Sequence, residues 1–222
     1  MSKVRKPRSK EDRRRRLSTI LRRLNKDYPN VECALRHRGP WELLAATILS
    51  AQCTDVRVNQ VTPGLFAKYP SVADMASVRQ EVLERDIQST GFFRNKARSL
   101  IGSAQRVASE FGGKVPETMD EILTLPGVAR KTANVVLGTW FGKATGVVVD
   151  THVQRIARRL DLTREKDPAK IEKDLMETIP KKRWILVSHQ IIHHGRQVCQ
   201  ARKPRCEECS LANLCYAPDK RV

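Results

Sequence analysis

Long apolar runs and aromatic residues are scarce in this sequence. No stretch approaches the roughly 18 apolar residues that a membrane-spanning helix requires, and aromatic residues make up 5 % of the 222 positions. The first residues also lack the apolar core of a secretory signal. We therefore expect a chain that is not exported, in a reducing compartment where its six cysteines do not pair into three disulfides.

Strand-like patterning is nearly absent as well. The run of valines at 147–149 is too short to build a sheet. Apolar residues instead recur at helical spacing, as in residues 17–24, where they define one buried face. We predict a last long helix over 182–194 that ends at Gly195. The sequence therefore predicts an all-α protein of about ten short helices.

Acidic residues are outnumbered, with 24 Asp and Glu against 42 Lys and Arg and a net charge of +18. Residues 1–16 hold nine basic and two acidic residues and so contribute +7, which leaves +11 for the rest of the chain. Such an excess predicts a polyanionic partner, most often nucleic acid. We interpret residues 1–16 as a flexible basic arm that adds non-specific affinity, with a targeting signal as the alternative.

A helix–turn–helix pattern surrounds one Pro-Gly turn. We predict helices over 118–124 and 130–141, joined by a turn within the run Leu125-Pro126-Gly127-Val128-Ala129-Arg130-Lys131-Thr132-Ala133. The backbone N–H groups at the start of the second helix, together with its dipole, would suit a DNA phosphate. An ordinary corner between two helices is the alternative for this pattern alone.

This run resembles the helix–hairpin–helix of the endonuclease III group of DNA base-excision repair enzymes. The resemblance extends from residue 17 to the last cysteine and includes four more motifs, Leu49-Ser50-Ala51-Gln52-Cys53-Thr54-Asp55, Gly91-Phe92-Phe93-Arg94-Asn95-Lys96-Ala97, Asn134-Val135-Val136-Leu137 and Val149-Asp150-Thr151-His152-Val153. Several ordered motifs at one family's spacing are far more specific than any one of them.

The resemblance implies two helical lobes with a DNA-binding groove between them. Residues 33–146 would form a six-helix barrel that carries the helix–hairpin–helix. Residues 17–32 together with 147–222 would form a discontinuous helical domain that carries an iron–sulfur cluster loop, and residues 1–16 would be the flexible arm.

Lys131 is the predicted nucleophile. It falls in the first turn of the predicted helix 130–141, where the positive end of the helix dipole and the adjacent Arg130 disfavour its ammonium form. A free amine can attack the sugar carbon that holds a damaged base, expel the base and form a Schiff base. The neighbouring C–H then becomes acidic, so β-elimination cuts the strand on the 3′ side. A solvated surface charge is the ordinary alternative for a lysine.

Asp150 precedes an apolar helical pattern, which predicts a helix N-cap. The resemblance implies that the matching aspartate is catalytic, and a carboxylate held by capping N–H groups can serve both purposes. It would stabilise positive charge on the sugar as the base departs, or assist proton transfer with Lys131. The sequence leaves these two catalytic roles open.

The resemblance also implies residues that enter the DNA when the target base leaves the stack. Gln52 would fill the gap or read the orphaned base, and Phe92 would be the wedge on the opposite side. His152 would face the same cleft. A polar helix end, a core aromatic and a cap-region histidine are their ordinary alternatives.

The hairpin departs from the family at one position. The resemblance implies phosphate contacts at Gly127, Ala129 and Arg130, yet the family commonly has a second glycine where this chain has Ala129. Alanine adopts a left-handed backbone poorly. Either Ala129 has ordinary dihedral angles or the hairpin is strained.

Four cysteines near the C-terminus have the spacing C-x6-C-x2-C-x5-C. Four soft thiolates so close together suit a metal centre, and zinc ribbons differ in having two close pairs. The spacing of Cys199, Cys206, Cys209 and Cys215 resembles the [4Fe-4S] loop of the endonuclease III group. The cluster would present a basic loop to DNA phosphate through Arg202, Lys203 and Arg205. We interpret the other two cysteines, Cys33 and Cys53, as small buried side chains.

The sequence is thus identified as a member of the endonuclease III family, with the activity of a bifunctional DNA glycosylase and AP lyase. Its expected substrate is double-stranded DNA with abasic sites or damaged bases, with oxidised pyrimidines as the family's usual target. We expect a monomer in the bacterial cytoplasm, associated with the nucleoid and not with membranes. The alternatives are a monofunctional adenine-mismatch glycosylase and a non-catalytic helix–hairpin–helix DNA-binding protein.

Overall fold

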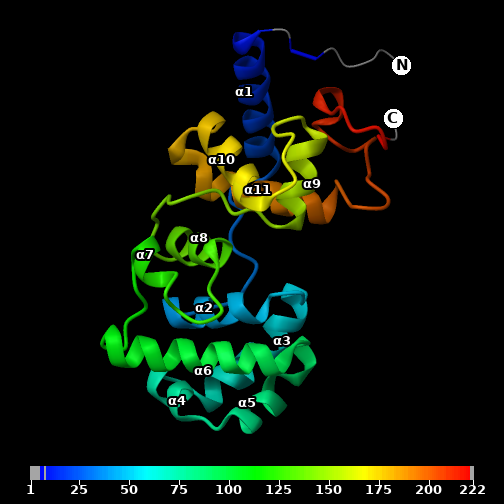
Figure 1. Cartoon of the computed structure of the whole chain (residues 1–222). Helices are drawn as coiled ribbons and strands as arrows, with labels where there is room; N and C mark the ends of the chain where they lie inside the picture. The colour runs from blue at the N-terminus through cyan, green and yellow to red at the C-terminus, as the bar shows by residue number, and fades with distance from the viewer. Residues whose placement is uncertain (1–5, 8, 221–222) are drawn as a thin grey trace. The chain divides into compact units, whose positions relative to one another are not determined.

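The structure is a computed structural model that describes residues 6–7 and 9–220. That part of the chain contains α-helices and short 3-10 helices but no β-strand, so the all-α prediction is confirmed (Figure 1). None of the described helices is both long and apolar enough to cross a membrane. The chain divides into two compact units, Cys33–Thr145 and the combination of Met1–Glu32 with Gly146–Val222.

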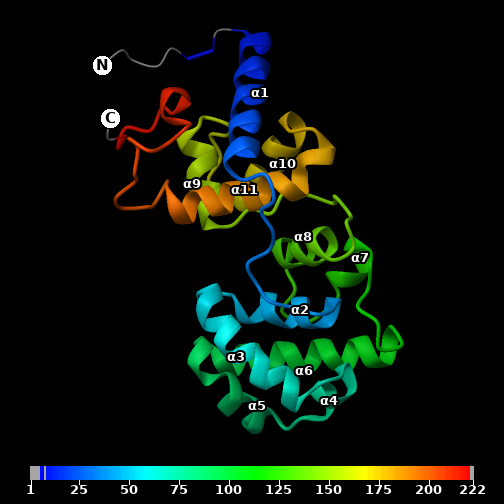
Figure 2. The ribbon, with the colours of Figure 1, turned by 180° about the vertical axis from the view of Figure 1, so that it is seen from behind.

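The unit Cys33–Thr145 is built around α2, whose residues are almost all buried. Pro40 occupies the first position of α2, where its missing N–H costs no hydrogen bond. The long helix α6 packs against α2, α4 and α5, while α8 packs against α2 and α7 (Figure 2). Its helices are α2 Pro40–Leu49, α3 Asp55–Lys68, α4 Val72–Ser77, α5 Gln80–Ile87, η1 Gln88–Thr90, α6 Phe93–Glu110, α7 Met119–Ile122 and α8 Arg130–Thr139.

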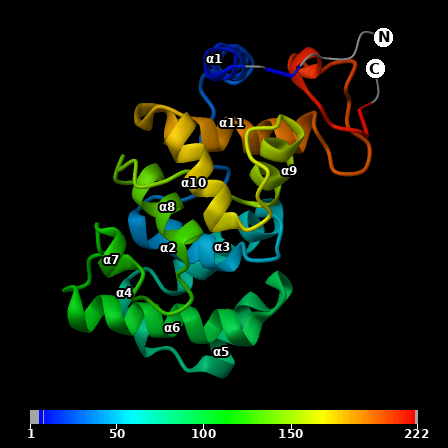
Figure 3. The same cartoon turned by 45° about the horizontal axis from the view of Figure 1, so that its top comes forward.

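The other unit has α11 at its centre, in contact with both α1 and α9 (Figure 3). Its apolar contacts join the N-terminal helix to the C-terminal third of the chain, because Ile20 and Leu24 of α1 and Ile191 of α11 are all buried. Its helices are α1 Lys10–Asp27, α9 Thr151–Arg159, α10 Pro168–Thr178, η2 Lys181–Arg183, α11 Trp184–Gln197 and η3 Ala212–Leu214.

The predicted flexible arm is wrong for its second half. Helix α1 begins at Lys10, and Ser9 and Asp12 form a reciprocal capping box at its start. Arg16, also assigned to the arm, donates hydrogen bonds to the carbonyl oxygens of Leu160 and Leu214. A cap and a tertiary anchor therefore make residues 10–16 part of the folded unit. Residues 1–5 and 8 of the predicted arm lie outside the described residues.

The predicted end of the last long helix is also wrong, because α11 continues through Gly195 to Gln197. A Cβ atom at Gly195 would lie 2.8 Å from Nδ1 of His152. The glycine therefore permits a close approach between α11 and α9 and does not end the helix.

Candidate active site and metal centre

The turn between α7 and α8 is fastened to α6. Gly127 has a left-handed backbone (φ 76°), and a Cβ atom there would lie 2.5 Å from the Cβ atom of Ser99. The Ser103 hydroxyl donates a hydrogen bond of 2.7 Å to the carbonyl oxygen of Pro126. Because both serines belong to α6, the turn can take only a residue without a side chain at this point.

Ala129 has ordinary extended dihedral angles, φ −97° and ψ 169°. The absence of a second glycine therefore introduces no backbone strain into the hairpin. Ala129 is the N-cap of α8, and it has no side-chain oxygen to accept a hydrogen bond from the first turn. Uncapped N–H groups and the helix dipole meet the physical requirements of an anion site at this end of α8.

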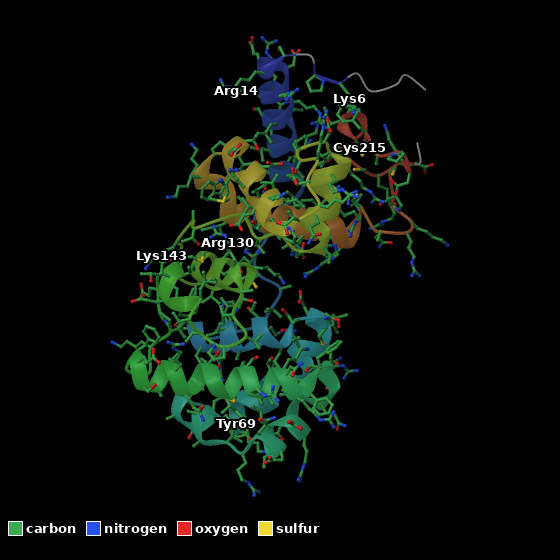
Figure 4. All side chains as sticks on the ribbon, viewed as in Figure 1. Lys6, Arg14, Tyr69, Arg130, Lys143 and Cys215 are labelled. Carbon is green, nitrogen blue, oxygen red and sulfur yellow. The ribbon has the colours of Figure 1, made fainter. Side chains whose placement is uncertain are left out.

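Lys131 is exposed in the first turn of α8. It directly follows Arg130, which is labelled in Figure 4. From Thr132 to Gly138 the same helix is buried. The helix is therefore anchored along its length while Lys131 points its amine at solvent. Such a lysine is accessible to a bound macromolecule and is held on a rigid element.

Asp150 lies in the other unit, at the N-terminus of α9. Its carboxylate accepts a hydrogen bond of 2.8 Å from the backbone N–H of Val153, which confirms the predicted N-cap. Asp150 is partly exposed. The cap therefore fixes the carboxylate and leaves part of it open to a ligand.

His152 follows Asp150 by two residues and is held by Arg155. The Arg155 guanidinium lies 3.1 Å from Nδ1 of His152, and because a guanidinium can only donate, Nδ1 must accept. Burial lowers the pKa of His152, while the nearby Asp150 carboxylate opposes this shift. The hydrogen bond therefore favours the neutral imidazole whose proton is on Nε2, which makes Nε2 a donor.

Four cysteine thiols line one small cavity beside α9. Cys199, Cys206, Cys209 and Cys215 all contribute to its wall. Burial, with a smaller contribution from the other three cysteines, raises the pKa of Cys209 to about 11. Because negative charge on these sulfurs is mutually unfavourable, the site favours a cationic group as its occupant. Among the described residues, no three His, Cys, Asp or Glu side chains converge on a single metal ion.

The sequence alone did not identify the residues that hold this segment. Arg159 of α9 donates to the Cys199 sulfur at 3.2 Å and pairs with Asp219. Arg155 donates to the Cys199 carbonyl at 2.8 Å, and His194 of α11 lies 3.5 Å from the Cys209 sulfur. Arg155 and Arg159 are four residues apart on the helix after Asp150. This spacing places them on one face of the helix and could have indicated a shared binding partner.

The remaining predicted contact residues lie on turns and loops. Gln52 and Phe92 are exposed, and Arg202 and Lys203 project from the loop between the first two clustered cysteines. Arg205 differs, because it donates to the Gln197 carbonyl and pairs with Glu208 at 3.1 Å. Part of its charge is therefore used inside the loop. The interpretation of Cys33 and Cys53 as buried is wrong, since both are only partly buried.

Comparison with known proteins decides the family. Residues 45–181 match the HhH-GPD superfamily base excision DNA repair protein family, and residues 199–215 match the iron-sulfur binding domain of endonuclease III. Endonuclease III of Synechocystis sp. is 53% identical over 214 residues, which cover 96% of each chain. The chain belongs to the endonuclease III family. Endonuclease III of Bacillus subtilis is 46% identical over 195 residues, 87% of this chain and 89% of the relative.

Solved endonuclease III structures share the fold. A trapped endonuclease III–DNA covalent intermediate superimposes with a TM-score of 0.88 at 43% identity, covering 91% of this chain and 95% of that one. A thermostable thymine-DNA glycosylase superimposes with a TM-score of 0.79 at 27% identity, covering 94% of this chain and 98% of that one. The endonuclease III family comprises DNA glycosylases with AP lyase activity, and this assigns the chain to base-excision repair. A [4Fe-4S] cluster is its cofactor.

Proposed function

We propose that Lys131 performs both steps of this endonuclease III activity. The observation that carries the proposal is an exposed lysine in the uncapped first turn of α8, at the end of a hairpin that α6 holds rigidly. The similarity to a trapped endonuclease III–DNA covalent intermediate supports a covalent route. The free amine of Lys131 attacks C1′ of the damaged nucleotide, and the C1′–N bond to the base breaks.

The base leaves with the bonding electron pair and takes up a proton. The covalent adduct then opens the sugar ring to give a Schiff base between Nζ of Lys131 and C1′. The positive iminium withdraws electrons from C2′, so a proton leaves C2′ and the bond to the 3′ oxygen breaks. Hydrolysis of the imine releases Lys131, and the strand remains cut on the 3′ side of the abasic site.

We assign the second catalytic role to Asp150. Its carboxylate is fixed by the N–H of Val153 and remains partly exposed. Negative charge held near the sugar stabilises the positive charge that develops there as the base departs.

We assign four groups of residues to DNA binding. The hairpin residues Gly127, Ala129 and Arg130 hold a phosphate at the start of α8. Gln52 and Phe92 enter the stack from two turns, and Nε2–H of His152 donates to an exposed base or phosphate. The exposed side chains of Arg202 and Lys203 bind backbone phosphates, with a smaller contribution from Arg205.

We assign the four cysteines that line the cavity as the ligands of the [4Fe-4S] cluster. The fit rests on the shared cavity, which brings four soft sulfur donors together within one segment. When bound, the cluster supplies iron–thiolate bonds that cross-link residues 199–215. This chain's own contribution is the pair Arg155 and Arg159, which bind the carbonyl and the sulfur of Cys199 and attach the segment to α9.

Borohydride reduction of the Schiff base tests the role of Lys131. We expect wild-type, cluster-loaded protein to form a covalent adduct with an abasic duplex, and Lys131→Ala to form none. Lys143→Ala is the matched control, because Lys143 is another exposed lysine of the same unit and pairs with Glu117. An adduct that persists in Lys131→Ala would assign the Schiff base to another amine.

We propose oxidised pyrimidines as the preferred lesion. The likeness to a thymine-DNA glycosylase gives a second candidate, thymine in a mismatch. A panel of duplexes that each carry one lesion discriminates between them. Fastest release of an oxidised pyrimidine supports the first candidate, whereas fastest release of mismatched thymine supports the second.

We also propose that the enzyme acts as a monomer on the nucleoid in the bacterial cytoplasm. The named relatives are bacterial, and chromosomal DNA is where its substrate lies. A fluorescent fusion should coincide with stained DNA in living cells, and sedimentation should give the mass of one 25.2 kDa chain.

A further inference from the structure

Two exposed turns of the unit Cys33–Thr145 share a rare backbone conformation. Gln52 (φ 51°) and Phe92 (φ 49°) both lie in the left-handed region. This region is unfavourable for a residue with a Cβ atom, so surrounding contacts must hold the chain there. The Phe92 side chain is 62% exposed, so its own packing does not supply those contacts.

Lys96 supplies contacts to both sides of the Phe92 turn. Its ammonium donates a hydrogen bond of 2.7 Å to the carbonyl oxygen of Thr90, two residues before Phe92. Its backbone N–H donates to the carbonyl oxygen of Phe92 at 3.2 Å. Lys96 is only 4% exposed, which is rare for a lysine and requires that its charge be satisfied internally.

The Gln52 turn adjoins the same site. Helix α3 begins at Asp55, shortly after Gln52, and packs against η1, whose last residue is Thr90. Burial lowers the pKa of Lys96, and the side chain of Cys53, the residue after Gln52, opposes this shift. The Lys96 ammonium therefore contacts the Phe92 turn directly and interacts electrostatically with the Gln52 turn.

We propose that Lys96 is a positioning residue for DNA opening, which holds the Thr90 carbonyl so that the Phe92 ring is oriented to enter the duplex. The contact between α3 and η1 extends this support to Gln52. The proposal rests on the proposed roles of Phe92 and Gln52. A ring that is already held at the surface requires less ordering when DNA binds, so the buried charge favours binding to stacked DNA.

The test replaces Lys96 with methionine, which matches the four-carbon stem of lysine in length and removes the ammonium. The substrate is a duplex with 2-aminopurine opposite an abasic-site analogue, because 2-aminopurine fluorescence rises when the base is unstacked. We expect Lys96→Met to lose this rise and to increase Kd and KM for duplex DNA about tenfold, the scale of one charge-assisted hydrogen bond. The effect on kcat and on trapping with single-stranded abasic DNA should be several-fold smaller.

Three companion variants make the test specific. Lys143→Met is the matched control for loss of a lysine from this unit and should give the wild-type fluorescence rise. Lys96→Arg retains a cationic donor and should recover part of the signal. Combining Lys96→Met with Phe92→Ala should add little to Phe92→Ala alone, because both remove the same insertion.

The possible outcomes separate this proposal from the function on which it rests. A normal fluorescence rise in Phe92→Ala would contradict the wedge role and overturn both. A loss in Phe92→Ala with a normal rise in Lys96→Met would overturn only the role of Lys96. Equal losses of activity of Lys96→Met on duplex and on single-stranded abasic DNA would also overturn the role of Lys96. Circular dichroism tests whether the variants fold. If neither Lys96→Met nor Lys96→Gln gives the wild-type spectrum, Lys96 is required for folding, and its proposed role as a positioning residue is overturned.

Discussion

The two units of the chain are both helical, yet they differ greatly in charge. The unit Cys33–Thr145 contains 14 of the 42 basic residues and 10 of the 24 acidic residues, so its net charge is +4. The other unit contains 28 basic and 14 acidic residues, so its net charge is +14. Lys131, the proposed nucleophile, belongs to the less basic unit.

We infer that most of the salt-dependent affinity for a polyanion belongs to the more basic unit, whereas the proposed nucleophile and the hairpin belong to the less basic one. Basic residues that contact phosphates supply affinity that depends on salt and little on sequence. Covalent chemistry instead requires one accessible amine on a rigid helix. Substitutions in both units test this division.

Replacement of Asp150 with asparagine should separate its cap from its charge. Asparagine caps a helix about as well as aspartate, so the thermal stability should change little. Loss of the carboxylate should reduce lyase kcat on an abasic duplex by about a hundredfold or more. Single-turnover kinetics and thermal unfolding measure the two effects. A large drop in stability with normal kcat would make Asp150 a structural residue only.

Loss of one cluster ligand should affect the more basic unit selectively. Cys199→Ser should remove the visible absorbance of the cluster and weaken binding to duplex DNA about tenfold, because the loop with Arg202 and Lys203 is no longer held. Hydrogen exchange in the full-length protein should rise in residues 199–215 and remain near wild type in Cys33–Thr145. Cys33→Ser is the matched control, since Cys33 lies outside the cavity.

An equal rise in hydrogen exchange in both units would contradict the division, because it would mean that the cluster stabilises the whole chain as one cooperative structure. Normal exchange in residues 199–215 after loss of absorbance would show that protein contacts alone hold the segment. In that case Arg155 and Arg159 would be sufficient for its attachment.

The hairpin turn should be sensitive to substitution of Gly127. Gly127→Ala combines a left-handed backbone with a close approach of 2.5 Å to Ser99, so we expect a loss of about 2 kcal/mol in the free energy of unfolding. Gly112→Ala is the matched control, because Gly112 is also left-handed (φ 57°) but has open space around it. Its loss should be about 1 kcal/mol. Urea denaturation measures both, and equal losses would show that the contact with Ser99 is unimportant.

The smallest effect should come from single phosphate contacts. Arg202→Ala and Lys203→Ala should each reduce the slope of log Kd against log salt concentration by about 0.9, without a change in single-turnover cleavage. Lys114→Ala in the less basic unit provides the comparison and should leave the slope unchanged. A change in the cleavage rate would contradict the separation of affinity from chemistry.

Much of the fold could be predicted because its signals are local. The N-cap at Asp150 and the helical run of apolar residues in α1 depend on neighbours within one or two helical turns. The candidate site was predictable for a related reason. Its chemistry is concentrated in short motifs, among them the run around Lys131 and the four closely spaced cysteines.

Local patterns did not predict the details that depend on distant neighbours. Ala129 is extended, and the prediction left this open because the same residue is compatible with a strained turn. Gly195 is a predicted helix end in isolation, yet it lies inside α11, where a Cβ atom would clash with His152. Arg16 belongs to a basic run but is anchored on carbonyl groups more than a hundred residues away.

The amino-acid pattern was enough to specify an all-helical protein of the endonuclease III family, with its hairpin, its cap and its cysteine spacing. Packing alone decided which cation is buried beside the Phe92 turn and which arginines hold the cysteine segment. The physical reason is range. Helix caps and periodicity act through a few adjacent residues, whereas desolvation and hydrogen bonds to distant carbonyls exist only after the helices have packed together.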